Sequence, residues 1–194
     1  MMNWLFTTTL VLITLYCGLT WYDYECWVHQ SQARRQAWLK FSQPLLGIVL
    51  TVHAYVVLAP CLNQTVLSLG VGRAMALLTW LMLVFDWLGH AFYRAESWRV
   101  FMMPLAVLTL GFSLVFPGNH LLYDMSNPAF IVHVFTALFA YSLFGLGALF
   151  AVLLLILDKA LHSKQHVGWL TNLPSLLQLE QTMFRLVLAG FTPV

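Results

Sequence analysis

Long apolar runs separated by short polar segments form the dominant pattern of this chain. The longest run extends from Ala129 to Leu157 and contains no charged residue. At a rise of about 1.5 Å per residue, such a run exceeds the ~30 Å hydrocarbon core of a bilayer. Its apolar character is continuous and does not alternate, as is typical of a membrane helix and not of a barrel strand. The pattern therefore predicts a helix that spans a membrane.

Similar runs occur four more times, so the sequence predicts five spans in a single membrane domain of residues 1–194. They cover about residues 4–21, 44–62, 66–88, 100–116 and 129–157. Pro44 suits a helix start, and Pro117 with Gly118 ends the fourth run. Apolar residues recur at helical spacing over 174–191, which predicts an interfacial or partial sixth helix. The predicted fold class is an all-α polytopic transmembrane helical bundle.

Composition and charge agree with this class and orient the spans. The chain is 61% hydrophobic and 8% charged, against about 25% charged residues in a typical soluble domain. Basic residues gather in alternate loops, which predicts that these loops are cytoplasmic and that the N-terminus is outside. These residues are Arg34, Arg35, Lys40, Arg94, Arg99, Lys159 and Lys164. A net charge of +2 without a basic patch argues against a nucleic-acid partner.

Two histidines, His53 and His133, lie inside apolar spans. The predicted topology places them about 10 Å and about 8 Å below the outer boundary, and thus in one layer. Ionisable residues within spans are costly and are candidates for function. Two imidazoles from different helices can hold a haem iron from opposite sides. Arg73 enters the third span at the same end and is a candidate partner for a haem propionate.

Structural alternatives exist for each of these residues. A histidine inside a span can instead make a hydrogen bond between helices, and Arg73 can extend its charge to the interface. The three cysteines form no CxxC pair, which argues against a disulfide framework or a zinc site.

Three stretches carry a resemblance to a known family. They are VHAYVVL around His53, HVFTALFAYSLF from His133 onward, and LPSLLQLEQTMFRLVLAGF near the end of the chain. Together with SLGVGRAMALLTW they resemble the cytochrome c assembly protein family over about residues 43–191. The closer similarity is to its HemX-like and YpjD-like inner-membrane branch, which is related to CcsA.

The resemblance implies a haem-binding integral membrane protein of the bacterial inner membrane that takes part in cytochrome c-type biogenesis. The haem is expected to be b-type and non-covalent, with His53 and His133 as the iron ligands. Expected partners are the lipid bilayer, haem and other cytochrome c maturation membrane proteins. Members that deliver haem carry a WGxxWxWD motif, which none of the eight tryptophans here forms. Binding, sensing or escorting haem, or tuning haem synthesis, therefore fits better than direct transfer.

The family normally continues for about two more spans, so the chain is expected to be truncated at its C-terminus. Two other function classes stay open. A transporter or scaffold without a cofactor would use the histidines as helix contacts, but the chain has no internal repeat of the kind typical of transporters. A membrane enzyme has little support, because no nucleophile and base set or HExxH motif is present. We therefore expect that the protein is not an enzyme.

Overall fold

The computed structural model describes most of the chain. The described residues are 2–29, 32–62, 66–68, 70–93, 98–116, 122–124 and 127–162, together with Leu177, Glu180, Gln181, Met183, Phe184 and Leu188. Within these residues the chain forms five helices and one pair of three-residue strands. The helical fold class predicted from the sequence is thus confirmed, apart from this strand pair.

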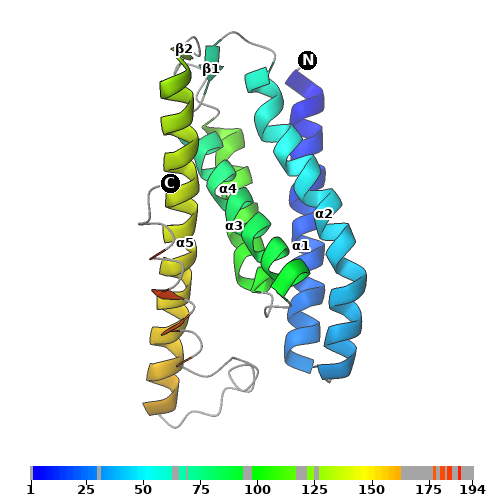
Figure 1. Cartoon of the computed structure of the whole chain (residues 1–194). Coiled ribbons are helices and arrows are strands. Elements are labelled where there is room, and N and C mark those ends of the chain that lie inside the picture. Colours follow the sequence, from blue (N-terminus) through cyan, green and yellow to red (C-terminus); the bar gives the residue numbers. More distant parts are fainter. Residues whose placement is uncertain are drawn as a thin grey trace.

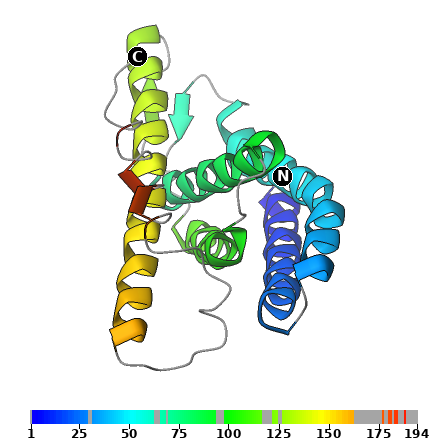
Figure 2. The ribbon, with the colours of Figure 1, turned by 60° about the horizontal axis from the view of Figure 1, so that its bottom comes forward.

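The five helices form a bundle in which α3 (Val71–Tyr93) and α4 (Arg99–Val115) occupy the middle. On one side lie α1 (Met2–His29) and α2 (Gln32–Leu62), and on the other side lies α5 (Pro128–His162), as Figures 1 and 2 show. The core is aliphatic, with Leu12, Leu46, Leu83, Met103 and Leu110 fully buried. Large apolar side chains on the outer surface, such as Leu155 (66% exposed), suit a lipid environment.

Four of the helices are long and apolar enough to cross a membrane. The apolar segments are Trp4–Val28, Ala37–Pro60, Val71–His90 and Pro128–Ala160, and α4 is a shorter apolar helix. Successive helices run in opposite directions. One end of the bundle therefore holds the end of α2, the start of α3, the end of α4 and the start of α5. The protein is therefore a multi-pass membrane protein by helix length and composition.

The polar segment that was predicted as the first loop, residues 22–42, is helical almost throughout. α1 continues to His29, and α2 begins at Gln32 and passes through Pro44. Residues 22–42 contain neither glycine nor proline, so no strong helix breaker prevents α1 and α2 from extending into this segment. The helices α1 and α2 therefore extend beyond the predicted end of the first span and the predicted start of the second span.

Two tryptophans of α3 fix α2 in place around Pro44. Trp87 donates its indole hydrogen to the Gln43 carbonyl at 2.9 Å, and the Gln43 amide donates to the Trp87 carbonyl at 3.0 Å. One heptad away on each helix, Trp80 donates to the Leu50 carbonyl at 2.8 Å. Gly47 allows the Trp87 ring to pack closely against α2, since a Cβ atom at position 47 would lie 3.1 Å from the ring. Hydrogen bonds of this kind join helices where water is absent.

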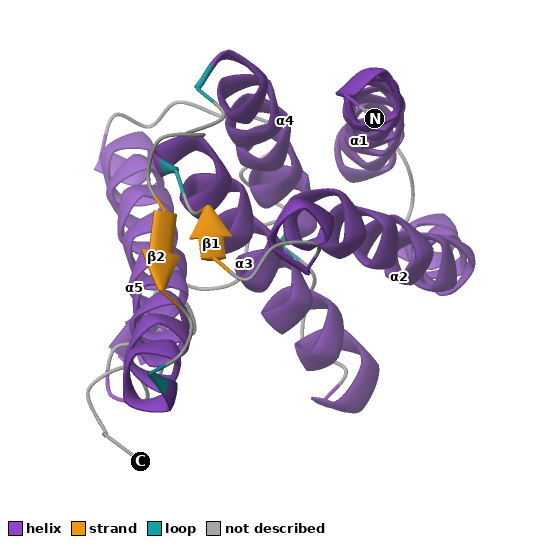
Figure 3. Cartoon of the chain, turned by 90° about the horizontal axis from the view of Figure 1, so that it is seen from above, coloured by secondary structure: helices purple, strands orange, loops and turns teal. Residues whose placement is uncertain are grey.

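A short antiparallel pair of strands covers the end of the bundle where α3 and α5 begin. β1 (Val66–Ser68) pairs with β2 (Leu122–Asp124), with Leu67 opposite Tyr123. Figure 3 shows the pair from above, between α5 and α3. The third span, which was predicted to start at Val66, therefore starts at Val71, because Gly70 separates the strand from the helix.

The helices α4 and α5 agree closely with the predicted spans of residues 100–116 and 129–157. α5 extends a little beyond its predicted span at its C-terminal end, to His162. The predicted helix of residues 174–191 lies mostly outside the described residues. The six residues that are described there are helical, and Met183 packs against the core.

Candidate functional site

His53 lies on the inward face of α2. Val49, Val56 and Val57 are buried on the same face, and the His53 side chain is 0% exposed. Its Nδ1 atom lies 3.0 Å from the hydroxyl of Tyr16 on α1, which is also 0% exposed. The two rings meet edge to face, with centroids 5.7 Å apart. His53 and Tyr16 thus form a buried hydrogen bond between α1 and α2.

The other ring nitrogen of His53 faces a closed interior. The ring interacts with the backbone of Ala76 on α3, although Nε2 itself makes no well-directed hydrogen bond among the described residues. A haem needs an open slot beside its ligand, and complete burial leaves no such slot next to His53. In this conformation His53 serves as a contact between three helices, which is the structural alternative stated above.

His133 is in a different environment, on the second turn of α5. It is exposed, and so are its neighbours Val132 (64%) and Phe135 (59%). α5 packs against α3, and the exposed positions lie away from that contact. The imidazole therefore sits in an apolar outer surface and is accessible to a ligand or another helix.

The structure does not bring His53 and His133 together. His53 is enclosed by α1, α2 and α3. His133 is exposed on α5, and α3 and α4 lie between α5 and the pair of α1 and α2 (Figure 1). A haem iron held between these two rings does not fit this arrangement, because one ring is sealed from any shared space. His133 alone fits as an accessible ligand on one side of an iron.

Arg73 is the third residue of α3 and lies at the same end of the bundle as His133. It is half-buried and interacts within the chain. The strand pair explains why Arg73 and His133 lie at the same end of the bundle, since β1 precedes α3, β2 precedes α5, and the two strands are paired. The predicted placement of both residues at one end is thus reproduced by the order of the helices.

A buried charged pair at the opposite end was not anticipated from the sequence. Asp23 of α1 is 6% exposed and Arg99 of α4 is 2% exposed. The Arg99 Nη2 atom donates to Asp23 Oδ1 at 2.7 Å, and Nε lies 2.7 Å from Oδ2 as an ion-pair contact. The hydrophobic pattern places both residues in polar loops, so it does not predict the pair. The absence of a helix breaker after Tyr22 was the signal that Asp23 stays within a helix.

Two side chains of α2 complete this cluster. The Trp38 indole donates to Asp23 Oδ1, and Ser42 Oγ accepts a hydrogen bond from Arg99 Nη2. Ser42 is held in turn by its bond to the Trp38 carbonyl at 2.8 Å. The cluster therefore ties α1, α2 and α4 together where they approach the predicted cytoplasmic side. Charged pairs that are buried and hydrogen-bonded tolerate the loss of water in this way.

Asp86 fixes the start of α4 from α3. Its Oδ1 atom accepts a hydrogen bond from the backbone N–H of Trp98 at 2.7 Å. Trp98 immediately precedes α4, so the carboxylate caps a helix N-terminus and faces the positive end of its dipole. Asp86 thereby joins the C-terminal part of α3 to the start of α4.

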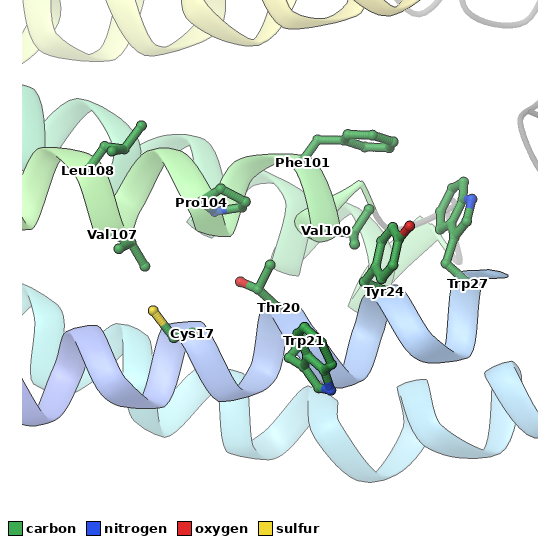
Figure 4. A pocket seen from close by; sticks show the side chains of 10 residues that line it. All are labelled: Cys17, Thr20, Trp21, Tyr24, Trp27, Val100, Phe101, Pro104, Val107 and Leu108. Carbon is green, nitrogen blue, oxygen red and sulfur yellow. The ribbon is translucent and has the colours of Figure 1, made fainter. Parts of the chain in front are cut away.

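A groove runs between α1 and α4 on the side of the bundle, next to the charged cluster. It encloses a volume of about 630 Å³ and is walled mainly by apolar side chains. Figure 4 shows Trp21, Tyr24 and Trp27 on α1, with Phe101 and Pro104 among the residues on α4. Among the described residues, no three His, Cys, Asp or Glu side chains gather into a set that could hold a metal ion.

Comparison with known proteins identifies the family. The sequence model of the cytochrome c assembly protein family matches residues 69–193, which is more than half of the chain. No curated protein matches the chain, and no solved structure does so. The matched region contains α3, α4 and α5 with Arg73, Arg99 and His133, whereas His53 and α1 precede it. The chain therefore belongs to the cytochrome c assembly protein family.

Proposed function

We propose that this protein is a haem-handling integral membrane protein in cytochrome c-type biogenesis. The single observation that carries the proposal is the family match over α3 to α5. This region includes His133, an accessible imidazole in an apolar outer surface. An apolar porphyrin suits such a surface, and a neutral imidazole suits its iron.

His133 is the ligand residue that this proposal favours. Its accessible ring would hold the iron of a non-covalent, b-type haem from one side, and the iron would supply the coordination chemistry when bound. Arg73, at the same end of the bundle, carries the charge that complements a propionate. His53 joins α1 and α2 through its hydrogen bond to Tyr16. Replacing His53 would therefore lower the stability of the protein and would not remove an iron ligand directly.

The proposed location is the inner membrane of a bacterium, with the N-terminus and the strand pair outside. The alternation of basic residues supports this orientation. We assign five crossings, in which α4 is the shortest, and an interfacial sixth helix over 174–191. The partners that this role implies are the lipid bilayer, haem and other membrane proteins of cytochrome c maturation.

Titration with haemin tests the ligand assignment. Purified protein in lipid nanodiscs is expected to develop a Soret band with haemin, and His133→Ala is expected to weaken binding about tenfold or more, because the iron loses its protein ligand. His162→Ala is the matched control, since His162 is an exposed histidine near the other end of the same helix. Arg73→Gln is expected to weaken binding less than His133→Ala does.

A scaffold or transporter without a cofactor is the second candidate. One observation favours it, namely that the fully buried histidine, His53, already serves as a contact between helices. This candidate predicts protein that gains no Soret band, or a band that His133→Ala and His162→Ala reduce equally. Either result would reject haem ligation by His133 and leave the family membership unchanged.

A further inference from the structure

The groove between α1 and α4 has the size of a small-molecule site. Its volume of about 630 Å³ lies within the range of about 300–1,000 Å³ that is usual for ligand pockets. The lining residues of α1 extend from Cys17 to Trp27, which corresponds to roughly 15 Å along the helix. It lies on the side of the bundle, between two helices at the level of the apolar spans (Figure 4). A ligand would therefore enter it from the lipid phase.

A backbone acceptor borders this groove. Pro104 lies inside α4 and has no N–H, so it cannot donate to the carbonyl of Val100 four residues earlier. Both Val100 and Pro104 line the groove. The Thr20 hydroxyl on the facing helix already donates to the Tyr16 carbonyl at 2.7 Å. The Val100 carbonyl thus lacks its regular helical partner next to a space that a ligand can fill.

A buried donor lines a small cavity next to the groove. Arg99 Nη1 has no hydrogen-bond partner among the described residues, although the side chain is only 2% exposed. Arg99 lines a second cavity of about 10 Å³, which shares Trp27 and Val100 with the groove. This volume admits about one oxygen atom. Where Trp27 and Val100 line it, here called the deep end, the groove therefore adjoins a small cavity that holds an unsatisfied donor.

Aromatic side chains shape the rest of the space. Trp21, Tyr24 and Trp27 come from α1 and Phe101 comes from α4. Trp27 and Phe101 pack edge to face, with ring centroids 5.7 Å apart. Aromatic walls favour a flat ring, which stacks against them or meets their edges.

We infer that this groove binds a quinone-class lipid, meaning a flat ring that carries hydroxyl or carbonyl oxygens and an apolar tail. The ring would lie among Trp21, Trp27 and Phe101, and a ring hydroxyl would donate to the Val100 carbonyl. A ring oxygen at the deep end would accept from Arg99, and the tail would extend into the bilayer. The reduced, hydroxyl-bearing form is the better match because Val100 offers an acceptor.

Two other occupants fit less well. An apolar helix fits less well because its backbone groups bond to one another and leave no donor for the Val100 carbonyl. A haem would find no imidazole among the lining residues. The α1 wall also precedes the region that matches the family, so the inference does not rest on the proposed haem function.

Quenching of tryptophan fluorescence tests the inference on the full chain in nanodiscs. Decylubiquinone is expected to quench saturably, because Trp21 and Trp27 border the groove, and decylubiquinol is expected to displace it. Cys17→Phe fills the groove at an exposed position and should weaken binding about tenfold or more. Leu15→Phe, at an exposed position of α1 outside the groove, should leave binding unchanged.

The substitution Pro104→Ala tests the role of the Val100 carbonyl separately. Alanine restores the N–H, so decylubiquinol should bind about three- to tenfold more weakly while decylubiquinone changes less. Circular dichroism of each variant checks that the helices are retained. The inference is overturned if decylbenzene, which has the same tail but no oxygen, displaces decylubiquinone as well as decylubiquinol does. It is also overturned if Cys17→Phe and Leu15→Phe act alike, or if haemin is the compound that Cys17→Phe excludes.

Discussion

Arg99 and Asp23 decide how α1 and α4 meet, because each carries a charge that is hidden from water. Asp23 is satisfied by Arg99 and Trp38, and Arg99 also donates to Ser42. The sequence could not predict this cluster, since an isolated acid and an isolated base next to aromatic residues also suit a solvated loop. Only the continuation of α1 beyond Tyr22 places Asp23 inside the bundle.

Removing one charge of this pair should destabilise the protein strongly. We expect Asp23→Asn and Arg99→Met each to lower the free energy of unfolding by about 3–5 kcal/mol, because the remaining charge stays buried without a partner. The double variant should recover most of this loss. Unfolding in detergent, followed by circular dichroism, measures the three values. A double variant whose loss equals the sum of the single losses would contradict the coupling.

The Tyr16 hydroxyl should contribute to stability only through its hydrogen bond to His53. Tyr16→Phe leaves the buried Nδ1 atom without its partner, and we expect a loss of about 1–3 kcal/mol in the free energy of unfolding. Tyr141→Phe is the control, since Tyr141 is 63% exposed on α5 and should change stability by less than about 0.5 kcal/mol. Equal effects of the two substitutions would show that the bond between α1 and α2 contributes little.

At the scale of the elements, the hydrophobic pattern predicts which parts of the chain form long apolar helices and not where these helices end. α4 and α5 follow their predicted spans closely, because Pro117 with Gly118 and Pro128 mark the adjoining borders in the sequence. α1 and α2 run past their apolar parts, and Val66 joins a strand. Where a helix ends outside the hydrocarbon layer depends on helix-breaking residues. The pairing of two strands that are distant in the chain leaves little trace in the sequence of either strand.

Gly72 sets the distance between α3 and α4 near the strand pair. A Cβ at this position would lie 2.6 Å from the Phe116 carbonyl oxygen and 2.7 Å from the Ser113 Cα atom. Backbone atoms cannot yield as a flexible side chain does, so Gly72→Ala should cost about 1–3 kcal/mol of stability. The measurement is the midpoint of thermal unfolding in detergent.

Gly89, on the same helix, provides the matched control for this prediction. A Cβ there meets nothing within 4 Å, so Gly89→Ala should stabilise α3 by about 0.5–1 kcal/mol. The two substitutions are chemically identical and are expected to act with opposite signs. If both raise the unfolding midpoint, α3 and α4 can separate at Gly72 without cost.

For the whole molecule, the order of the helices indicates toward which end of the bundle a residue lies, but not in which direction its side chain points around the helix. Chain order alone places His53 and His133 toward the same end. Which way each side chain points depends on the faces that the helices bury, and on their neighbours. α2 buries His53 against α1 and α3, while α5 meets α3 with a face that leaves His133 outside. Equal depth is therefore a weak basis for pairing two residues laterally.

The direction of α4 is the point on which the proposed topology depends. With 17 residues, α4 is about 25 Å long, slightly shorter than the hydrocarbon core. It nevertheless packs along α3 for its full length, because Asp86 holds Trp98 at its start and Gly72 contacts Phe116 at its end. Because α4 is enclosed in this way, we propose that it crosses the same layer as its neighbours, with the small mismatch met by local thinning of the bilayer.

Fusions to reporter proteins test this topology in bacterial cells. Green fluorescent protein inserted after residue 31 or 95 should fluoresce, because we expect both sites to be cytoplasmic. Alkaline phosphatase at the N-terminus or after residue 120 should be active, because we expect both sites to be outside. Matching signals at sites 95 and 120 would mean that α4 does not cross. A complete reversal of the pattern would place His133 and Arg73 toward the cytoplasm, and haem would then have to be bound from that side.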